Sequence, residues 1–213
     1  LIDLPSHGES TGTRITFGAT ESSAIRATLK YLQQSAPGEK VAVVGVSLGA
    51  AFLVLGGAVP VPAAVVVESM YPTLREAVAN RLEMRLGPPG RLLAGPLLWQ
   101  LPLRLGLTES DMRPIDRIVS LAAPIAVASG TQDEHTTWPE TLRLFTAAAG
   151  PKELWPFEGA AHVDAQTVCH AVTCRCLTVR WVGGLATRPP RPTHAATGVG
   201  RGKSPALTSM PGT

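Results

Sequence analysis

The feature of this sequence that most strongly suggests chemistry is a serine between two glycines, Gly45-x-Ser47-x-Gly49. It follows an apolar run at residues 41–44 and precedes a stretch of small and apolar residues that favours a helix. A sharp turn from strand to helix would hold the Ser47 hydroxyl exposed on a strained bend, with both glycines letting strand and helix approach closely. The amide of Leu48 would then face an oxyanion forming on a substrate carbonyl. The pattern predicts a nucleophilic serine.

The same five residues also fit two other interpretations. One is a glycine-rich turn in which the serine is incidental. The other is a nucleotide-binding loop, which requires Gly-x-Gly-x-x-Gly for a dinucleotide or Gly-Lys-Ser/Thr for a phosphate, and neither motif is present. The serine nucleophile and the purely structural turn therefore remain as the two alternatives at this point.

Asp133 and His162 could complete the chemistry of Ser47. Each lies in a loop that directly follows an apolar run, as Ser47 does. In open α/β sheets the loops at the carboxyl ends of the strands meet at one edge, so these three distant side chains would converge. Ser47 would attack a carbonyl carbon, His162 would take and return the proton, and Asp133 would orient the imidazole.

The remaining histidines and cysteines are assigned no chemical role. We expect His7 to be a structural loop histidine and His135 a residue of the site's rim. Glu68 ends a predicted strand near the site and is left outside the catalytic set. The spacing of the cysteines, all in the C-terminal part of the chain, lacks the Cys-x-x-Cys pair typical of zinc sites, and no metal is expected. They are Cys169, Cys174 and Cys176.

The pattern of the chain indicates how these residues are positioned. Apolar runs predict strands at residues 1–4, 41–44, 63–67, 124–128 and 152–157, and apolar periodicity predicts helices at about 21–36, 73–86 and 138–149. Their alternation implies a mostly parallel sheet with crossover helices. An apolar, proline-broken segment at about 87–112 is predicted to be a lid that lines an acyl-sized pocket, or alternatively a helix packed on the sheet.

Charge is distributed unevenly along the chain. Residues 165–213 hold six of the 19 Lys and Arg residues and none of the 16 acidic ones, so residues 1–164 carry a net charge of −3 although the whole chain carries +3. A mildly acidic body argues against a nucleic-acid surface. Residues 165–213 lack periodicity and are predicted to be a disordered basic tail. No apolar run reaches the roughly 20 residues that a membrane span needs.

Taken together, the motifs resemble those of the α/β-hydrolase superfamily, and within it the bacterial serine-aminopeptidase (S33)-like and lysophospholipase-like hydrolases. The resemblance covers residues 1–164. It is carried by Asp3-x-x-x-His7-Gly8-x-Ser10, Gly45-x-Ser47-x-Gly49, Glu68-x-x-x-Pro72, Gly130-x-x-Asp133 and Gly159-x-x-His162. It implies the α/β-hydrolase fold and makes Asp133 the acid in preference to Glu134.

The resemblance also implies that residues 1–4 correspond to the family's fourth strand, so that the first strands are missing. The family's second oxyanion donor, which follows its third strand, would be missing as well. The loss of one such donor costs about 2.7–4 kcal/mol of transition-state stabilisation, which slows a reaction without abolishing it.

The function expected is hydrolysis of a carboxylic ester, thioester or small amide through an acyl-enzyme on Ser47, without a cofactor. The substrate expected is a small molecule with an apolar portion. A cytoplasmic location is expected, with the alternative that an N-terminal signal or anchor is missing from the given sequence. The alternative is a non-catalytic binding module or inactive fragment of the same fold. An Asp nucleophile, as in haloalkane or epoxide chemistry, is disfavoured by Ser47.

Overall fold

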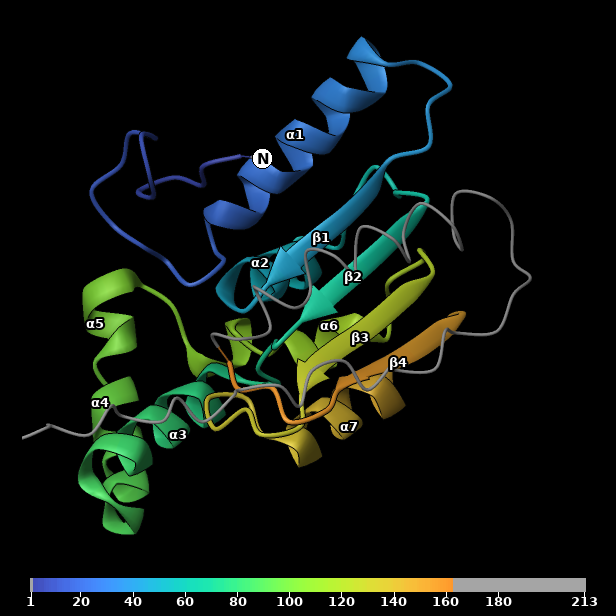
Figure 1. Ribbon diagram of the computed structural model, residues 1–213. Helices are drawn as coiled ribbons and strands as arrows, with labels where there is room; N and C mark the ends of the chain where they lie inside the picture. Colours follow the sequence, from blue (N-terminus) through green and yellow to red (C-terminus); the bar gives the residue numbers. More distant parts are fainter. Residues whose placement is uncertain (1, 163–213) are drawn as a thin grey trace, which may run out of the picture.

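The computed structural model describes residues 2–162, and these fold around a four-stranded parallel sheet (Figure 1). The strands stand in chain order β1-β2-β3-β4. Their bounds are Ala42–Val46 for β1, Ala64–Glu68 for β2, Ile125–Gly130 for β3 and Lys152–Phe157 for β4. Four of the five predicted strands are therefore confirmed. The predicted tail at residues 165–213, with its three cysteines, lies outside the described residues.

The two central strands are the most buried, as their sequences predict. Every residue of β2 and β3 is buried, whereas β1 is partly exposed. Val65 pairs with Ile125 and Val67 with Val127 in register, so the β-branched runs form one continuous layer. A strand buried on both faces needs apolar side chains at successive positions rather than alternate ones, which is why these runs were recognisable.

The prediction of a strand at residues 1–4 is wrong for its described residues, 2–4, which have no regular structure. Their backbone groups are used in a local turn instead. The amide of His7 donates to the carbonyl of Leu4, and the hydroxyl of Ser10 donates to the carbonyl of Asp3. An apolar run becomes a strand only where a neighbouring strand accepts its hydrogen bonds. Within residues 2–162, β1 pairs only with β2.

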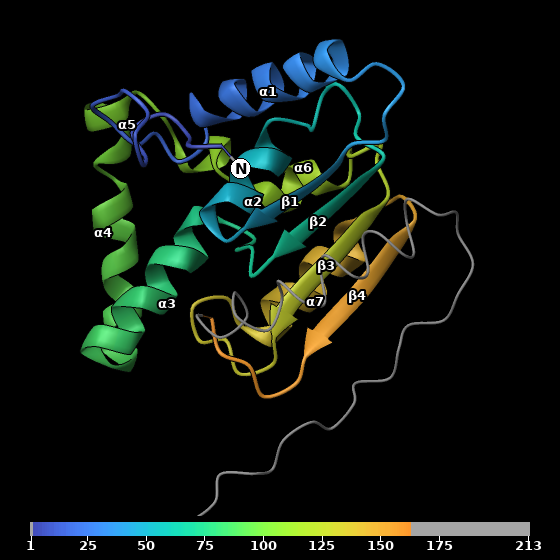
Figure 2. The ribbon, with the colours of Figure 1, turned by 45° about the horizontal axis from the view of Figure 1, so that its top comes forward.

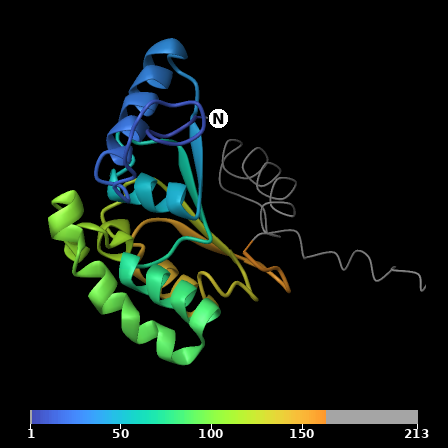
Figure 3. The ribbon, with the colours of Figure 1, turned by 90° about the vertical axis from the view of Figure 1, so that its left-hand side faces the viewer.

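Helices of the described part pack on one face of the sheet (Figure 3). They are α1 (Glu21–Ser35), α2 (Leu48–Leu55), α6 (Pro114–Ile118) and α7 (Trp138–Ala147). Ile25 of α1, Phe52 of α2 and Leu144 of α7 share one core with the inward side chains of β2 and β3. The predicted helices at 21–36 and 138–149 are confirmed to within a few residues. No helix of residues 2–162 is long and apolar enough to cross a membrane.

The proline-rich segment forms short helical pieces rather than one long helix. After α3 (Leu74–Leu86), Gly87 turns the chain with a φ of +74°, and the chain continues as η1 (Pro88–Leu93), α4 (Ala94–Leu98) and α5 (Leu101–Leu105). The short η2 (Glu109–Asp111) then leads to α6. Figures 1 and 2 place α3, α4 and α5 beside the sheet on the side toward which the strands point. Proline lies near the start of η1 and α5 and inside α4, so the segment is interrupted as its proline content predicts.

Candidate active site

Ser47 occupies the bend between β1 and α2, as predicted. Its backbone has φ +50° and ψ −112°, a strained conformation for a non-glycine residue. The Ser47 amide donates a 2.7 Å hydrogen bond to the carbonyl of Glu68 at the end of β2, which fixes the bend to the sheet. The helix α2 begins at Leu48, so the Leu48 amide is among the first-turn amides that have no partner within the helix.

The two glycines of the motif differ in their surroundings. A Cβ on Gly45 would lie 2.6 Å from the Cα of Ala50, so strand and helix are as close there as the pattern predicts. A Cβ on Gly49 would meet no atom within 4 Å outside its chain neighbours and the backbone of its own helix, so the predicted close approach at Gly49 is wrong. Gly49 is the second residue of α2, and its Cβ position faces open space rather than β1.

Asp133 and His162 lie in hydrogen-bonding contact. The Nδ1 atom of His162 is 2.8 Å from Oδ2 of Asp133, and the Asp133 side chain is fully buried. The other oxygen, Oδ1, accepts hydrogen bonds from the amides of His135 and Thr136. Burial alone would raise the pKa of Asp133, but the hydrogen bonds from His162 and Thr136 lower it below its ordinary value. Asp133 is therefore an ionised acceptor that fixes the orientation of His162.

The loops that carry Asp133 and His162 are joined through their backbones. The carbonyl of Ala160 accepts a 3.0 Å hydrogen bond from the amide of Gln132, and the Gly159 amide donates to the hydroxyl of Thr131. A Cβ on Gly130 would lie 2.1 Å from the Ala160 oxygen, so only glycine permits this approach. Gly130 and Gly159 belong to the motifs Gly130-x-x-Asp133 and Gly159-x-x-His162. The close approach of the two loops explains why the first motif begins with glycine.

We expect Gly130→Ala to destabilise the fold by about 1–3 kcal/mol, because the added methyl group must push the two loops apart. The measurement is the free energy of unfolding in urea. Gly150→Ala is the matched control, since a Cβ there would meet ordinary contacts of 3.8 Å or more and should change stability by less than about 0.5 kcal/mol. Equal stabilities for the two variants would contradict the close approach.

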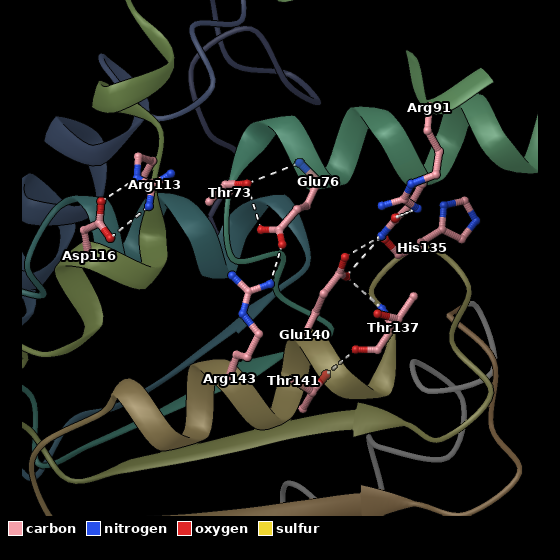
Figure 4. A network of polar contacts seen from close by, with 11 residues as sticks. Thr73, Glu76, Arg91, Arg113, Asp116, His135, Thr137, Glu140, Thr141 and Arg143 are labelled. Carbon is pink, nitrogen blue, oxygen red and sulfur yellow. Dashed lines mark hydrogen bonds and ion pairs between the residues drawn. The ribbon is translucent and has the colours of Figure 1, made fainter. Parts of the chain in front are cut away.

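A network of polar side chains anchors the loop of Asp133 from outside (Figure 4). The buried Asn80 of α3 donates from Nδ2 to the carbonyl of His135 and to the carboxylate of Glu140 in α7. The Oδ1 atom of Asn80 accepts from Arg91 of η1, and Arg91 also pairs with Glu83. The network thus ties α3, η1 and α7 to the loop after β3.

Sequence analysis did not identify Asn80 or Glu140 as part of the site's support. Glu140 had a readable signal, because Thr137 and Glu140 form a capping box at the start of α7 and have the Thr-x-x-Glu spacing of that motif. Asn80 had none, since the residues that it connects to the site, His135 and Glu140, lie 55 and 60 residues away.

His135 and His7 lie where they were expected, in different settings. The ring of His135 is 4.7 Å from that of His162, which places it at the rim of the Asp133–His162 pair. Burial lowers the pKa of His135, and charge on His162 lowers it further, so His135 is neutral at neutral pH. His7 makes structural contacts: its Nδ1 is 2.9 Å from the carbonyl of the nearby Pro5, and its ring meets that of Phe52 in α2 edge-on.

Ser47 is not hydrogen-bonded to His162 in this structure. Ser47 is half-buried, and its hydroxyl makes no hydrogen bond with any of residues 2–162. Catalytic hydrogen bonds are often long in ligand-free proteins and shorten only when substrate is bound. Within the same residues, no group of three His, Cys, Asp or Glu side chains is arranged to hold a metal ion.

The chain belongs to the alpha/beta hydrolase family, whose model matches residues 1–197. Among solved structures, an esterase from Pyrococcus furiosus superposes with a TM-score of 0.62, with 21% identity over 85% of this chain and 70% of its own. A monoacylglycerol lipase from Paleococcus ferrophilus gives 0.54, with 22% identity over 82% and 80%. An α/β hydrolase from Penicillium gives 0.59, with 18% identity over 83% and 76%. A search of curated proteins gives no match.

Proposed function

We propose that this protein is a serine hydrolase that cleaves carboxylic esters, thioesters or small amides through an acyl-enzyme on Ser47. The observation that carries the proposal is the 2.8 Å hydrogen bond between buried Asp133 and Nδ1 of His162. It fixes the tautomer in which Nδ1 carries the proton and Nε2 is free to accept one. Membership of the alpha/beta hydrolase family, and structural neighbours named as an esterase and a lipase, support the same chemistry.

In the proposed reaction, the Ser47 oxygen bonds to the substrate carbonyl carbon as its proton passes to Nε2 of His162. The carbonyl oxygen becomes an oxyanion, which the Leu48 amide stabilises at the start of α2. When the carbon–leaving group bond breaks, His162 returns the proton to the departing alcohol, thiol or amine. Water then attacks the acyl-enzyme with His162 again acting as base, which releases the acid and restores Ser47.

Within the family, the motif set favours a lysophospholipase-like or serine-aminopeptidase-like substrate with an apolar portion. The apolar segment formed by η1, α4 and α5 supports this, as it lies on the side of the sheet toward which the strands point (Figures 1 and 2). We infer that residues 87–112 form a lid-like insertion in a core of residues 1–164.

The test is covalent labelling by a fluorophosphonate, followed by measurement of the intact mass and of ester hydrolysis. The folded chain should take up one label and lose activity in proportion. Ser47→Ala should abolish labelling, whereas Ser120→Ala, at an exposed serine that bonds only to the nearby Arg117 carbonyl, should label fully. A folded chain that never labels and hydrolyses no ester would favour a non-catalytic binding module.

A further inference from the structure

His135 connects the proposed catalytic pair to the helix α3. Its amide donates a 2.9 Å hydrogen bond to Oδ1 of Asp133. Its carbonyl accepts a 3.2 Å hydrogen bond from Nδ2 of Asn80 in α3 (Figure 4). Both hydrogen-bonding groups of its backbone are therefore used, one by the Asp133 carboxylate and one by a buried side chain. A residue held on both sides of its Cα gives its side chain a fixed starting point.

The anchor on the carbonyl side of His135 is itself held in place. The side-chain amide of Asn80 also donates to Glu140 at 2.9 Å, and the Glu140 carboxylate accepts from the amide of Thr137. The Oδ1 atom of Asn80 accepts a 3.0 Å hydrogen bond from Arg91. Asn80 and Glu140 are both buried, and hydrogen bonds are stronger where water is excluded. The His135 backbone is thus attached to a buried network rather than to a solvated side chain.

The ring of His135 packs against the ring of His162. Their centroids are 4.7 Å apart and their planes are inclined by 40°, a separation at which aromatic rings attract each other. The Nδ1 atom of His135 is buried and has no hydrogen-bond partner among residues 2–162. The two rings are therefore in packing contact, with no hydrogen bond between them.

One hydrogen bond does not fix the orientation of an imidazole completely. The bond from Nδ1 of His162 to Asp133 sets the direction of that nitrogen, but the ring can still tilt about the bond, which moves Nε2. In the proposed reaction Nε2 must face the Ser47 hydroxyl, and a misplacement of about 1 Å can slow a reaction about 100-fold. A second contact on the ring restricts the tilt. The loop after β3 supplies both contacts, since it carries Asp133 and His135.

We propose that His135 is a positioning residue of the active site, which restrains the tilt of the His162 imidazole through ring packing. This inference rests on the proposed function, in which His162 is the base. The role goes beyond the rim location that the sequence predicts for His135. Because the restraint is a contact between rings, another aromatic side chain can replace His135, whereas a small side chain cannot.

The kinetic test compares two substitutions of His135 in the full chain, with p-nitrophenyl esters as substrates and the urea midpoint as the check on folding. His135→Ala should lower kcat about tenfold and leave KM within about twofold, because the ring contact acts on the base and not on substrate binding. His135→Phe restores an aromatic ring and should keep kcat within about threefold of the unchanged chain. His7→Ala is the matched control, since it also removes an imidazole that meets an aromatic ring, that of Phe52, and should keep full activity.

A second, spectroscopic test does not depend on activity. The hydrogen-bonded Nδ1 proton of His162 should give a low-field proton NMR resonance, which the loss of the signal in His162→Gln assigns. A tilting ring exposes this proton to exchange with water, so the resonance should broaden in His135→Ala and stay sharp in His135→Phe. The measurement is valid whether or not the chain hydrolyses an ester, so a failure of this inference is distinguishable from a failure of the proposed function.

Three results would overturn the proposal. An unchanged resonance in His135→Ala would show that the ring does not restrain His162, even in a chain that hydrolyses esters. Equal losses of kcat in His135→Ala and His135→Phe would assign the effect to the imidazole nitrogens rather than to the ring. Parallel losses of kcat and of urea stability, as large in His7→Ala as in His135→Ala, would indicate that His135 only supports the fold.

Discussion

Replacing Ser47 with alanine is expected to lower kcat for ester hydrolysis by about a millionfold, to the level set by binding and the Leu48 amide alone. The loss is this large because the proposed covalent intermediate forms on the Ser47 oxygen, and water does not reproduce its position between β1 and α2. Fold stability should change little, because the Ser47 hydroxyl makes no hydrogen bond within residues 2–162. Alanine at φ +50° is about as strained as serine.

The measurement is kcat and KM on p-nitrophenyl esters of increasing chain length, with the urea midpoint as the check on folding. Ser120→Ala serves as the control and should keep full activity. A Ser47→Ala protein that retains activity within about a hundredfold would place the nucleophile elsewhere and end the proposed mechanism.

The strands could be predicted from the sequence because their signal is local. β2 and β3 consist of successive apolar residues, and buried parallel strands need such runs. The strand prediction failed at residues 2–4 because it, too, rested on a local signal alone. A short apolar run shows what a residue prefers, but not whether a partner strand is adjacent, and here the hydrogen bonds go to a turn built on Asp3 and Leu4.

Of the three loops predicted to converge, the structure brings those of Asp133 and His162 into contact and shows no hydrogen bond from the Ser47 hydroxyl to either residue. Asp133 and His162 each follow a strand, and the parallel sheet brings their loops to one edge, where the two side chains come within 2.8 Å. The residues that hold the Asp133 loop in place were not predictable. Asn80 belongs to α3, which is far from Asp133 and His162 in the sequence, and it contacts the loop because α3, η1 and α7 pack together. Local spacing carries no information about such contacts.

Replacing Asp133 with asparagine is expected to lower kcat by about 10⁴-fold while the loop keeps its shape. The amide oxygen can still accept from the amides of His135 and Thr136, but the proton on Nδ1 of His162 loses its anionic partner and the wrong tautomer becomes populated. Asp116→Asn is the matched control. Asp116 also has a lowered pKa, owing to its hydrogen bond from Arg113, but its side chain is 55% exposed and its partner is an arginine rather than His162.

The same substitution should change the response of stability to acid. The pKa of Asp133 lies below its ordinary value of 3.8 in the folded protein, so its ionisation stabilises the fold above that pH, and this contribution is lost as the pH falls through the folded pKa. Between about pH 6 and pH 3, unfolding in urea should therefore show a smaller loss of stability for Asp133→Asn than for the unchanged chain. Identical acid profiles of the two proteins would show that the Asp133 carboxylate does not stabilise the fold. Activity of Asp133→Asn within about tenfold of the unchanged chain would show that the carboxylate does not orient His162.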